Sequence, residues 1–191
     1  MLSSPQQRVY PDFDSIERRY NIILADPPFS FRVHQFDNGT VRNAANHYKT
    51  MTDQDIIKLP VSKLAADNCA LFLWVPNPDL NLLNSILQSW QFEFKTMGFV
   101  WVKTTKTGKS FMGMGHYTRA GCESCLLAMK GRVPVIDHSV KQVVVAPIGR
   151  HSEKPVEIHH RIVKLFGDLP RIELFSRRRV DGWDHHGWEI S

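Results

Sequence analysis

The chain has 191 residues, of which 42% are apolar and 23% charged, so it is long enough for one domain with a sizeable core. No apolar run approaches the length of a membrane span, and the N-terminus lacks the profile of a signal peptide. Three cysteines are an odd number, which argues against a disulfide framework. We therefore expect a soluble, cytoplasmic protein with no membrane segment. Its net charge of +5 is compatible with a polyanionic partner but does not require one.

Short apolar runs predict the strands of one sheet. In chain order they cover residues 22–25, 69–75, 99–102, 124–129, 142–146 and 172–175. Three helices are predicted by their start signals, which are a Thr52-x-x-Asp55 pattern close to a capping box, an Asn77-Pro78 pair and a Lys154-Pro155 pair. Apolar strands that alternate with amphipathic helices predict an α/β, Rossmann-like fold, in which helices cover both faces of a mostly parallel sheet.

We expect residues 1–191 to form a single domain, with residues 1–19 as an N-terminal extension. Two long polar segments, residues 30–49 and 104–120, fit neither a strand nor a helix pattern. Loops of this length in a compact domain are usually functional or disordered. Both follow the carboxyl ends of predicted strands, so both should overhang the sheet edge that carries Asp26. We expect them to be the substrate and active-site loops.

The sequence Asp26-Pro27-Pro28-Phe29 ends the first predicted strand with a carboxylate, two prolines and a ring. Proline cannot donate to a strand ladder, so this corner should be stiff and lie at the carboxyl edge of the sheet, where open α/β folds bind ligands. The Asp26 carboxylate and the Pro27 carbonyl offer two acceptors for the hydrogens of an exocyclic amino group. Such binding frees the nitrogen lone pair and stabilises the positive charge that develops during attack. The corner suits methylation of a nucleobase amino group, although an ordinary turn could contain the same four residues.

Six segments taken together resemble one protein family. They are ADPPF (25–29), HYKTM (47–51), LFLWV (71–75), GFVWVK (98–103), HSEKP (151–155) and IELFSRRRVDGWDHHGWE (172–189). The family is the MT-A70 family of S-adenosylmethionine-dependent adenine methyltransferases, typified by the catalytic subunit of the eukaryotic messenger-RNA adenosine methyltransferase. The resemblance runs from about residue 20 to residue 190 in one order, without a large gap. It implies the class I methyltransferase fold and S-adenosylmethionine as cofactor.

The resemblance also implies the site residues. The catalytic set would be Asp26, Pro27, Pro28, Phe29 and Tyr48. Asp26 and the Pro27 carbonyl would bind the target amino group, while Phe29, where most relatives have Trp, would stack on the adenine. Tyr48 would lie beside the target and the methyl donor. The cofactor set would be Asp26, Lys103, His151, Ser152, Lys154, Glu173, Phe175, Arg177 and Glu189.

Three further positions carry expectations of their own. Glu123 matches an acidic position of the family, where it would either orient the substrate loop or be a structural carboxylate. Near the end of the chain His186 and Trp188 depart from the family pattern, and Trp188 replaces an asparagine that would bind ribose.

The substrate set combines Phe29 and Tyr48 with basic residues of the two polar loops. We expect the basic residues to line one groove above Asp26 and to hold phosphates; they are Arg32, Arg42, Lys49, Lys106, Lys109 and Arg119.

A metal site is the rival interpretation of Cys122-x-x-Cys125. On a predicted strand two cysteines three residues apart would point to opposite faces, and only Cys69 remains as a third thiol. The adjacent histidine pairs at 159–160 and 185–186 diverge in the same way. We therefore expect no metal.

The sequence predicts an adenine-N(6)-methyltransferase that acts by direct in-line transfer on an adenine flipped out of duplex DNA. A small chain without a separate target-recognition domain suggests DNA in a bacterial or phage-infected cell. An RNA adenosine methyltransferase and a catalytically inactive, nucleic-acid-binding partner subunit are the alternatives. The sequence leaves open the target motif and whether the chain works as a homodimer or with a partner subunit.

Overall fold

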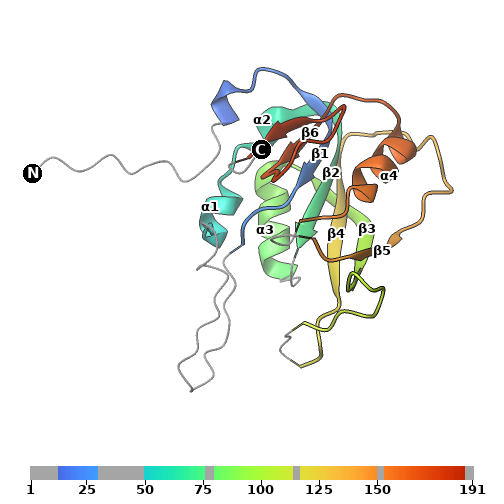
Figure 1. Cartoon of the computed structure of the whole chain (residues 1–191). Helices are drawn as coiled ribbons and strands as arrows, with labels where there is room; N and C mark the ends of the chain where they lie inside the picture. The colour runs from blue at the N-terminus through green and yellow to red at the C-terminus, as the bar shows by residue number, and fades with distance from the viewer. Residues whose placement is uncertain (1–12, 30–49, 76–79, 114–116, 150–152, 188–191) are drawn as a thin grey trace, which may run out of the picture.

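The computed structural model describes residues 13–29, 50–75, 80–113, 117–149 and 153–187 (Figure 1). Within them seven strands form one sheet in the order β5-β3-β4-β2-β1-β6-β7. The strands are β1 (Tyr20–Ala25), β2 (Ala65–Val75), β3 (Glu93–Thr104), β4 (Cys122–Lys130), β5 (Val143–Pro147), β6 (Arg171–Leu174) and β7 (Asp184–His186). The helices are a 3-10 turn (Phe13–Ser15), α1 (Asp53–Ile57), α2 (Val61–Leu64), α3 (Leu80–Trp90) and α4 (Glu157–Phe166).

Most neighbouring strands of the sheet are parallel. β1 pairs in parallel with β2 and β6, β6 with β7, and β3 with β5, whereas β4 is antiparallel to both β2 and β3. The carboxyl ends of β1, β2, β3 and β6 therefore meet at one edge of the sheet, where β4 begins. This confirms the predicted α/β fold with a mostly parallel sheet.

Two apolar clusters cover the two faces of the sheet, because side chains alternate along each strand. On one face Ile23 packs with residues of α1, α2 and α3, among them the fully buried Trp90. On the other face Leu24 packs with Ile158 and Ile162 of α4. Figure 1 shows α1, α2 and α3 apart from α4. The predicted placement of helices on both faces is confirmed.

The ends of the helices follow local chemistry in two cases. The Thr52 side chain accepts a hydrogen bond from the Asp55 N–H at 3.2 Å and so caps α1 as predicted. Gly167 follows α4 with φ of 89°, a conformation that glycine adopts without strain. However, α4 begins at Glu157 rather than directly after Lys154-Pro155, and the non-helical residues 153–155 lead into the site described below. The predicted Asn77-Pro78 start lies outside the described residues.

Part of the polar segment 104–120 is a paired ribbon. Thr104 pairs with Ser110, and Gly113 pairs with Ala120, in short antiparallel bridges. The segment leaves the carboxyl end of β3, so it starts at the sheet edge of Asp26 as predicted. The other polar segment, residues 30–49, lies outside the described residues. None of the described helices is both long and apolar enough to cross a membrane.

Candidate active site

Asp26 stands directly after β1, near the middle of the sheet. Its N–H still donates to the Leu174 carbonyl of β6, at 3.4 Å. Pro27 has no N–H, so the pairing stops there. The Pro27 carbonyl accepts the Phe29 N–H at 2.8 Å, and the Pro28 carbonyl accepts the Met51 N–H at 2.8 Å. These contacts hold the corner, and the Pro27 carbonyl keeps a second lone pair for a ligand.

Four charged side chains form a chain of ion pairs at this corner. Lys154 Nζ lies 2.7 Å from Asp26 Oδ2 and 3.2 Å from Glu123 Oε2. Glu123 Oε1 accepts a hydrogen bond from Lys103. The four side chains are only 9% to 20% exposed. Asp26 and Lys154 are therefore in direct contact, and Glu123 joins Lys103 to them.

Strand periodicity explains why these residues share one face. Asp26 is two residues after Leu24, and Lys103 is two residues after Trp101. Both side chains therefore lie on the face of the sheet that packs against α4. Glu123, two residues before Cys125, lies on the same face at the start of the antiparallel β4. The sequence offered a structural and a functional interpretation of Glu123, and the structure places its carboxylate between the two predicted cofactor lysines.

The charges of the cluster have different surroundings. Burial raises the pKa of Asp26, and Lys154 only partly opposes this increase. Burial also acts to raise the pKa of Glu123, but Lys154 and Lys103 outweigh it, so the net pKa of Glu123 is lowered. The pKa of Lys154 is raised, because Asp26 and Glu123 outweigh its burial. Asp26 is thus the carboxylate that most readily takes up a proton.

Aromatic rings surround both lysines. Lys154 Nζ lies 5.3 Å from the centre of the Trp74 ring, and Lys103 Nζ lies 5.1 Å from that of Trp101 and 6.0 Å from that of Phe111. Such contacts stabilise a desolvated ammonium group. The buried Trp74 Nε1 has no hydrogen-bond partner among the described residues. Sequence reasoning missed the roles of Trp74 and Phe111, because nothing in their spacing distinguishes them from core residues.

Phe29 is buried, although its predicted role needs an exposed ring face. It is 8% exposed and belongs to the core cluster that also contains Met51. Little of its ring is therefore open for stacking in this state, and the stacking on adenine stays a prediction.

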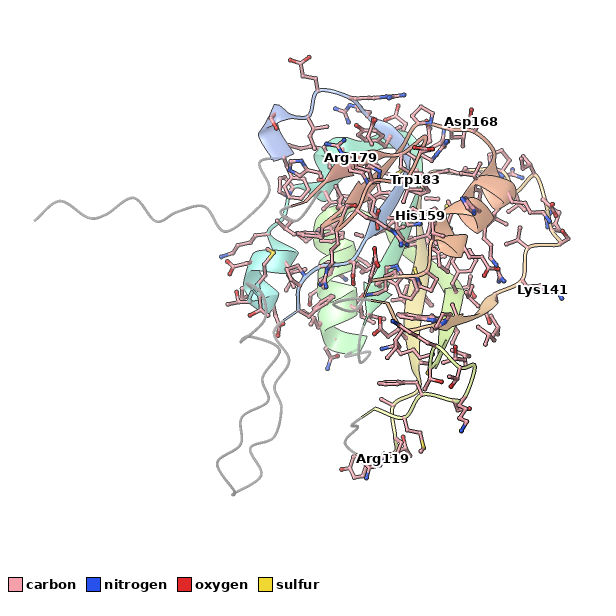
Figure 2. All side chains as sticks on the ribbon, in the orientation of Figure 1. Arg119, Lys141, His159, Asp168, Arg179 and Trp183 are labelled. Carbon is pink, nitrogen blue, oxygen red and sulfur yellow. The ribbon has the colours of Figure 1, made fainter. Side chains whose placement is uncertain are left out.

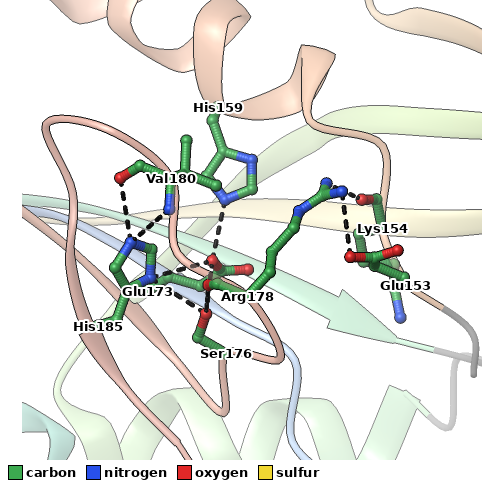
Figure 3. Close-up of polar contacts among 8 residues, drawn as sticks. All are labelled: Glu153, Lys154, His159, Glu173, Ser176, Arg178, Val180 and His185. Carbon is green, nitrogen blue, oxygen red and sulfur yellow. Dashed lines mark hydrogen bonds and ion pairs between the residues drawn. The ribbon is translucent and has the colours of Figure 1, made fainter. Parts of the chain in front are cut away.

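Glu173 is the centre of a second polar cluster, on the α4 face of β6 (Figure 3). Its Oε2 lies 3.0 Å from His159 Nε2 of α4, 3.1 Å from Ser176 Oγ and 3.5 Å from His185 Nδ1 of β7. Burial would raise the pKa of Glu173, but the hydrogen bonds of the two histidines and Ser176 lower it to about 2. Glu173 therefore connects α4, β6 and β7, and its predicted contact with the cofactor is untested.

The turn after β6 leads back to Asp26. Phe175 has a φ of 63°, which is rare for a bulky residue and is a conformation that clusters at functional sites. Arg177 is close enough to lower the pKa of Asp26, although burial outweighs it. Arg178 donates to the Lys154 carbonyl at 2.6 Å and pairs with Glu153 at 3.1 Å (Figure 3). This turn thereby holds the backbone that presents Lys154.

Of the predicted substrate residues, three that the structure describes lie outside the two clusters. Lys106, Lys109 and Arg119 are exposed on the segment after β3, and Figure 2 shows Arg119 away from the body of the sheet. Tyr48, His151, Ser152 and Glu189 lie outside the described residues, as do Arg32, Arg42, Lys49 and Trp188. The carbonyl of His186 accepts the Phe175 N–H at 2.6 Å.

The cysteine pair agrees with the predicted geometry. Cys122 is exposed and Cys125 is buried, so the two thiols do not converge. In the part of the chain that the structure describes, no three His, Cys, Asp or Glu side chains gather as metal ligands do.

Glu173→Gln should lower the free energy of unfolding at pH 7 by roughly 3 kcal/mol, which corresponds to the fall in the pKa of Glu173 from 4.5 to about 2. A depressed pKa stabilises the fold above pH 4.5, and this contribution is lost as the pH falls towards 2. Urea unfolding of both proteins at several pH values measures the difference, which should shrink in acid. Glu93→Gln, at a side chain that is 76% exposed, is the control. If the difference in the free energy of unfolding did not change with pH, the lowered pKa of Glu173 would not be its cause.

Comparison with known proteins identifies the family. Residues 20–189 match the sequence profile of the MT-A70 family. The chain is 34% identical to the type II methyltransferase M.MunI of Mycoplasma sp., over 98% of this chain and 84% of that protein. It is 30% identical to METTL3, the N(6)-adenosine-methyltransferase catalytic subunit of Homo sapiens, over 85% of this chain and 26% of that protein. It is 28% identical to the human N(6)-adenine-specific methyltransferase METTL4, over 91% of this chain and 38% of that protein. The resemblance noted in the sequence is therefore confirmed, and the chain belongs to the MT-A70 family.

Proposed function

We propose that this protein transfers the methyl group of S-adenosylmethionine to the exocyclic amino group of adenine in DNA. Methyl transfer is supported by the names of all three relatives, and adenine by those of METTL3 and METTL4. DNA is favoured because the relative matched over most of its own length is a type II methyltransferase. The observation that carries the proposal is the Asp26 carboxylate, held at the stiff end of β1 by Lys154 at 2.7 Å.

The two oxygens of Asp26 would have different tasks. Lys154 donates to Oδ2. Oδ1 would accept one hydrogen of the target amino group, and the free lone pair of the Pro27 carbonyl would accept the other. With both hydrogens held, the nitrogen lone pair is free for attack. The carboxylate also stabilises the positive charge that develops on this nitrogen.

The residues of the site fit the cofactor. S-adenosylmethionine carries a carboxylate, an ammonium and a sulfonium group, and when bound it supplies a methyl group that is activated by the positive sulfur. Lys103 and Lys154 can face a carboxylate, and Asp26 can face a cation. We assign cofactor contacts to Lys103, Phe175 and Arg177 at the carboxyl ends of β3 and β6. His151, Ser152 and Glu189 would complete the set.

The test is a methylation assay on purified protein with labelled S-adenosylmethionine and both DNA and RNA. Nucleoside mass spectrometry should find N(6)-methyladenine in DNA, and its absence from both polymers would refute the activity. Methylation of RNA alone would support the alternative function, an RNA adenosine methyltransferase. Sequencing of DNA from a methylation-free bacterial strain that expresses the chain should then reveal the target motif.

A further inference from the structure

The ribbon between β3 and β4 projects from the edge that carries Asp26 (Figure 1). The Lys103 N–H donates to the Gly121 carbonyl at 2.8 Å, and the Lys103 carbonyl accepts the Phe111 N–H at 3.1 Å. Further out, Gly113 and Ala120 exchange both backbone hydrogen bonds, at 2.6 and 3.2 Å. The described part of the segment is therefore held as a short antiparallel ribbon by backbone pairs at its root and at Gly113 and Ala120.

The root of the ribbon is fixed to the proposed active site. Lys103 precedes it and Glu123 follows it, and these two side chains form an ion pair. Glu123 also pairs with Lys154, which contacts Asp26. The direction of the ribbon is thus set by the same charges that surround the target-binding carboxylate.

The outer part of the ribbon has an unusual surface. Tyr117 is 102% exposed and Met112 is 76% exposed, the highest values among the large apolar side chains that the structure describes. Residues 104–121 also contain three basic residues, Lys106, Lys109 and Arg119, and no Asp or Glu. An exposed ring on a purely basic segment is complementary to a polyanion that also offers stacking surfaces, as nucleic acids do.

We propose that this ribbon enters a groove of duplex DNA and that Tyr117 fills the space left when the target adenine turns out towards Asp26. This inference rests on the proposed function. An adenine that reacts at its amino group must leave the stack, and proteins often keep a stack open with an inserted side chain. The major groove admits a two-stranded β-ribbon.

The dimensions of the ribbon agree with this role. Tyr117 precedes Gly121 by four residues, a length of chain that spans at most roughly 13 Å at the usual rise along a strand. The major groove is about 8.5 Å deep. A ring at this distance from the root can therefore reach the base stack while the root stays at the active site.

The test compares two duplexes that contain the target motif found by sequencing. In one the target adenine is paired with thymine, and in the other it faces an abasic position, so that no base pairing opposes its exit. Tyr117→Ala should lower kcat/KM on the paired duplex by about tenfold or more and on the abasic duplex by much less, because only the first needs a wedge. Tyr117→Trp should retain activity on both.

Two controls separate the wedge from simple charge attraction. The double variant Lys106→Ala/Lys109→Ala should weaken binding to both duplexes equally. The slope of the logarithm of the binding constant against the logarithm of the salt concentration should become less steep by nearly two, since each phosphate contact contributes about 0.9. With 2-aminopurine at the target position, wild-type protein should raise the fluorescence of the base, and Tyr117→Ala should raise it less.

Several outcomes would overturn the inference. Equal losses on both duplexes, or no loss on either, would mean that Tyr117 is not a wedge. A change in oligomeric state of Tyr117→Ala, measured by light scattering without any loss of activity, would assign the tyrosine to a protein contact instead. If wild-type protein methylated neither duplex, the proposed function itself would fail, and the wedge with it.

Discussion

Asp26→Asn should lose methyl transfer as completely as Asp26→Ala, by on the order of 10²–10³-fold in the single-turnover rate. The reason is the Lys154 ammonium 2.7 Å from Oδ2, which has three donors and no acceptor. The new amide must keep its oxygen towards Lys154, so its NH₂ group would face the target amino group, and two donors would meet. From the sequence alone, Asn would be expected to exceed Ala because it keeps one acceptor, and the Lys154 contact removes that advantage.

Cofactor binding and a matched variant make this experiment specific. Calorimetry should still detect S-adenosylmethionine binding to both Asp26 variants, which excludes a general loss of structure. Asp67→Asn makes the same change at an exposed position of β2, away from the carboxyl end of that strand, and should leave the rate unaltered. Residual activity of Asp26→Asn well above that of Asp26→Ala would show that Lys154 does not fix the orientation of residue 26.

The strands β1 to β6 and the corner at Asp26 could be predicted because each is encoded locally. Continuous apolar runs indicate buried strands, and two prolines after a strand can only end it. Lys103 and Lys154 could be proposed as site residues, but not their meeting at Glu123. That contact depends on β4 entering antiparallel between β2 and β3, so that the start of one strand lies beside the ends of two others. No local pattern reports this order.

The cluster around Glu173 could not be predicted for a different reason. β7 has three residues, Asp184–His186, and none of them is apolar, so neither strand periodicity nor propensity marks it. It forms because β6 offers a parallel edge and because Glu173 binds His185 and His159. A buried carboxylate that satisfies side chains from other elements is a tertiary feature, and the sequence reports only its residue type.

Lys154→Met should shift the acid limb of the pH–rate profile to higher pH. Burial raises the pKa of Asp26, and Lys154 is the largest influence that opposes this rise. Without the ammonium, Asp26 stays protonated over a wider range and cannot accept the amino hydrogen from the target. The rate at pH 7 should therefore fall and should recover in part as the pH increases. Single-turnover rates between pH 5.5 and 9 measure the shift.

The stability of the same variant gives an independent check with a defined sign. A folded-state pKa of Asp26 above its unfolded value of 3.8 means that the folded state binds the proton more tightly, so the free energy of unfolding falls as the pH rises through the folded pKa. Removing one partner of a buried pair costs about 3 kcal/mol or more once the other is charged. Urea unfolding of Lys154→Met should thus show a larger deficit at pH 8 than at pH 5, whereas Lys141→Met, at an exposed position, should show none. Lys154→Arg is the matched variant for the pH–rate profile. It retains the charge but not the compact geometry of the ammonium group, so the acid limb of its profile should stay in place while its rate falls.

An unmoved acid limb in Lys154→Met would mean that another cation keeps Asp26 ionised. Arg177 is the candidate, because it also lowers the pKa of Asp26.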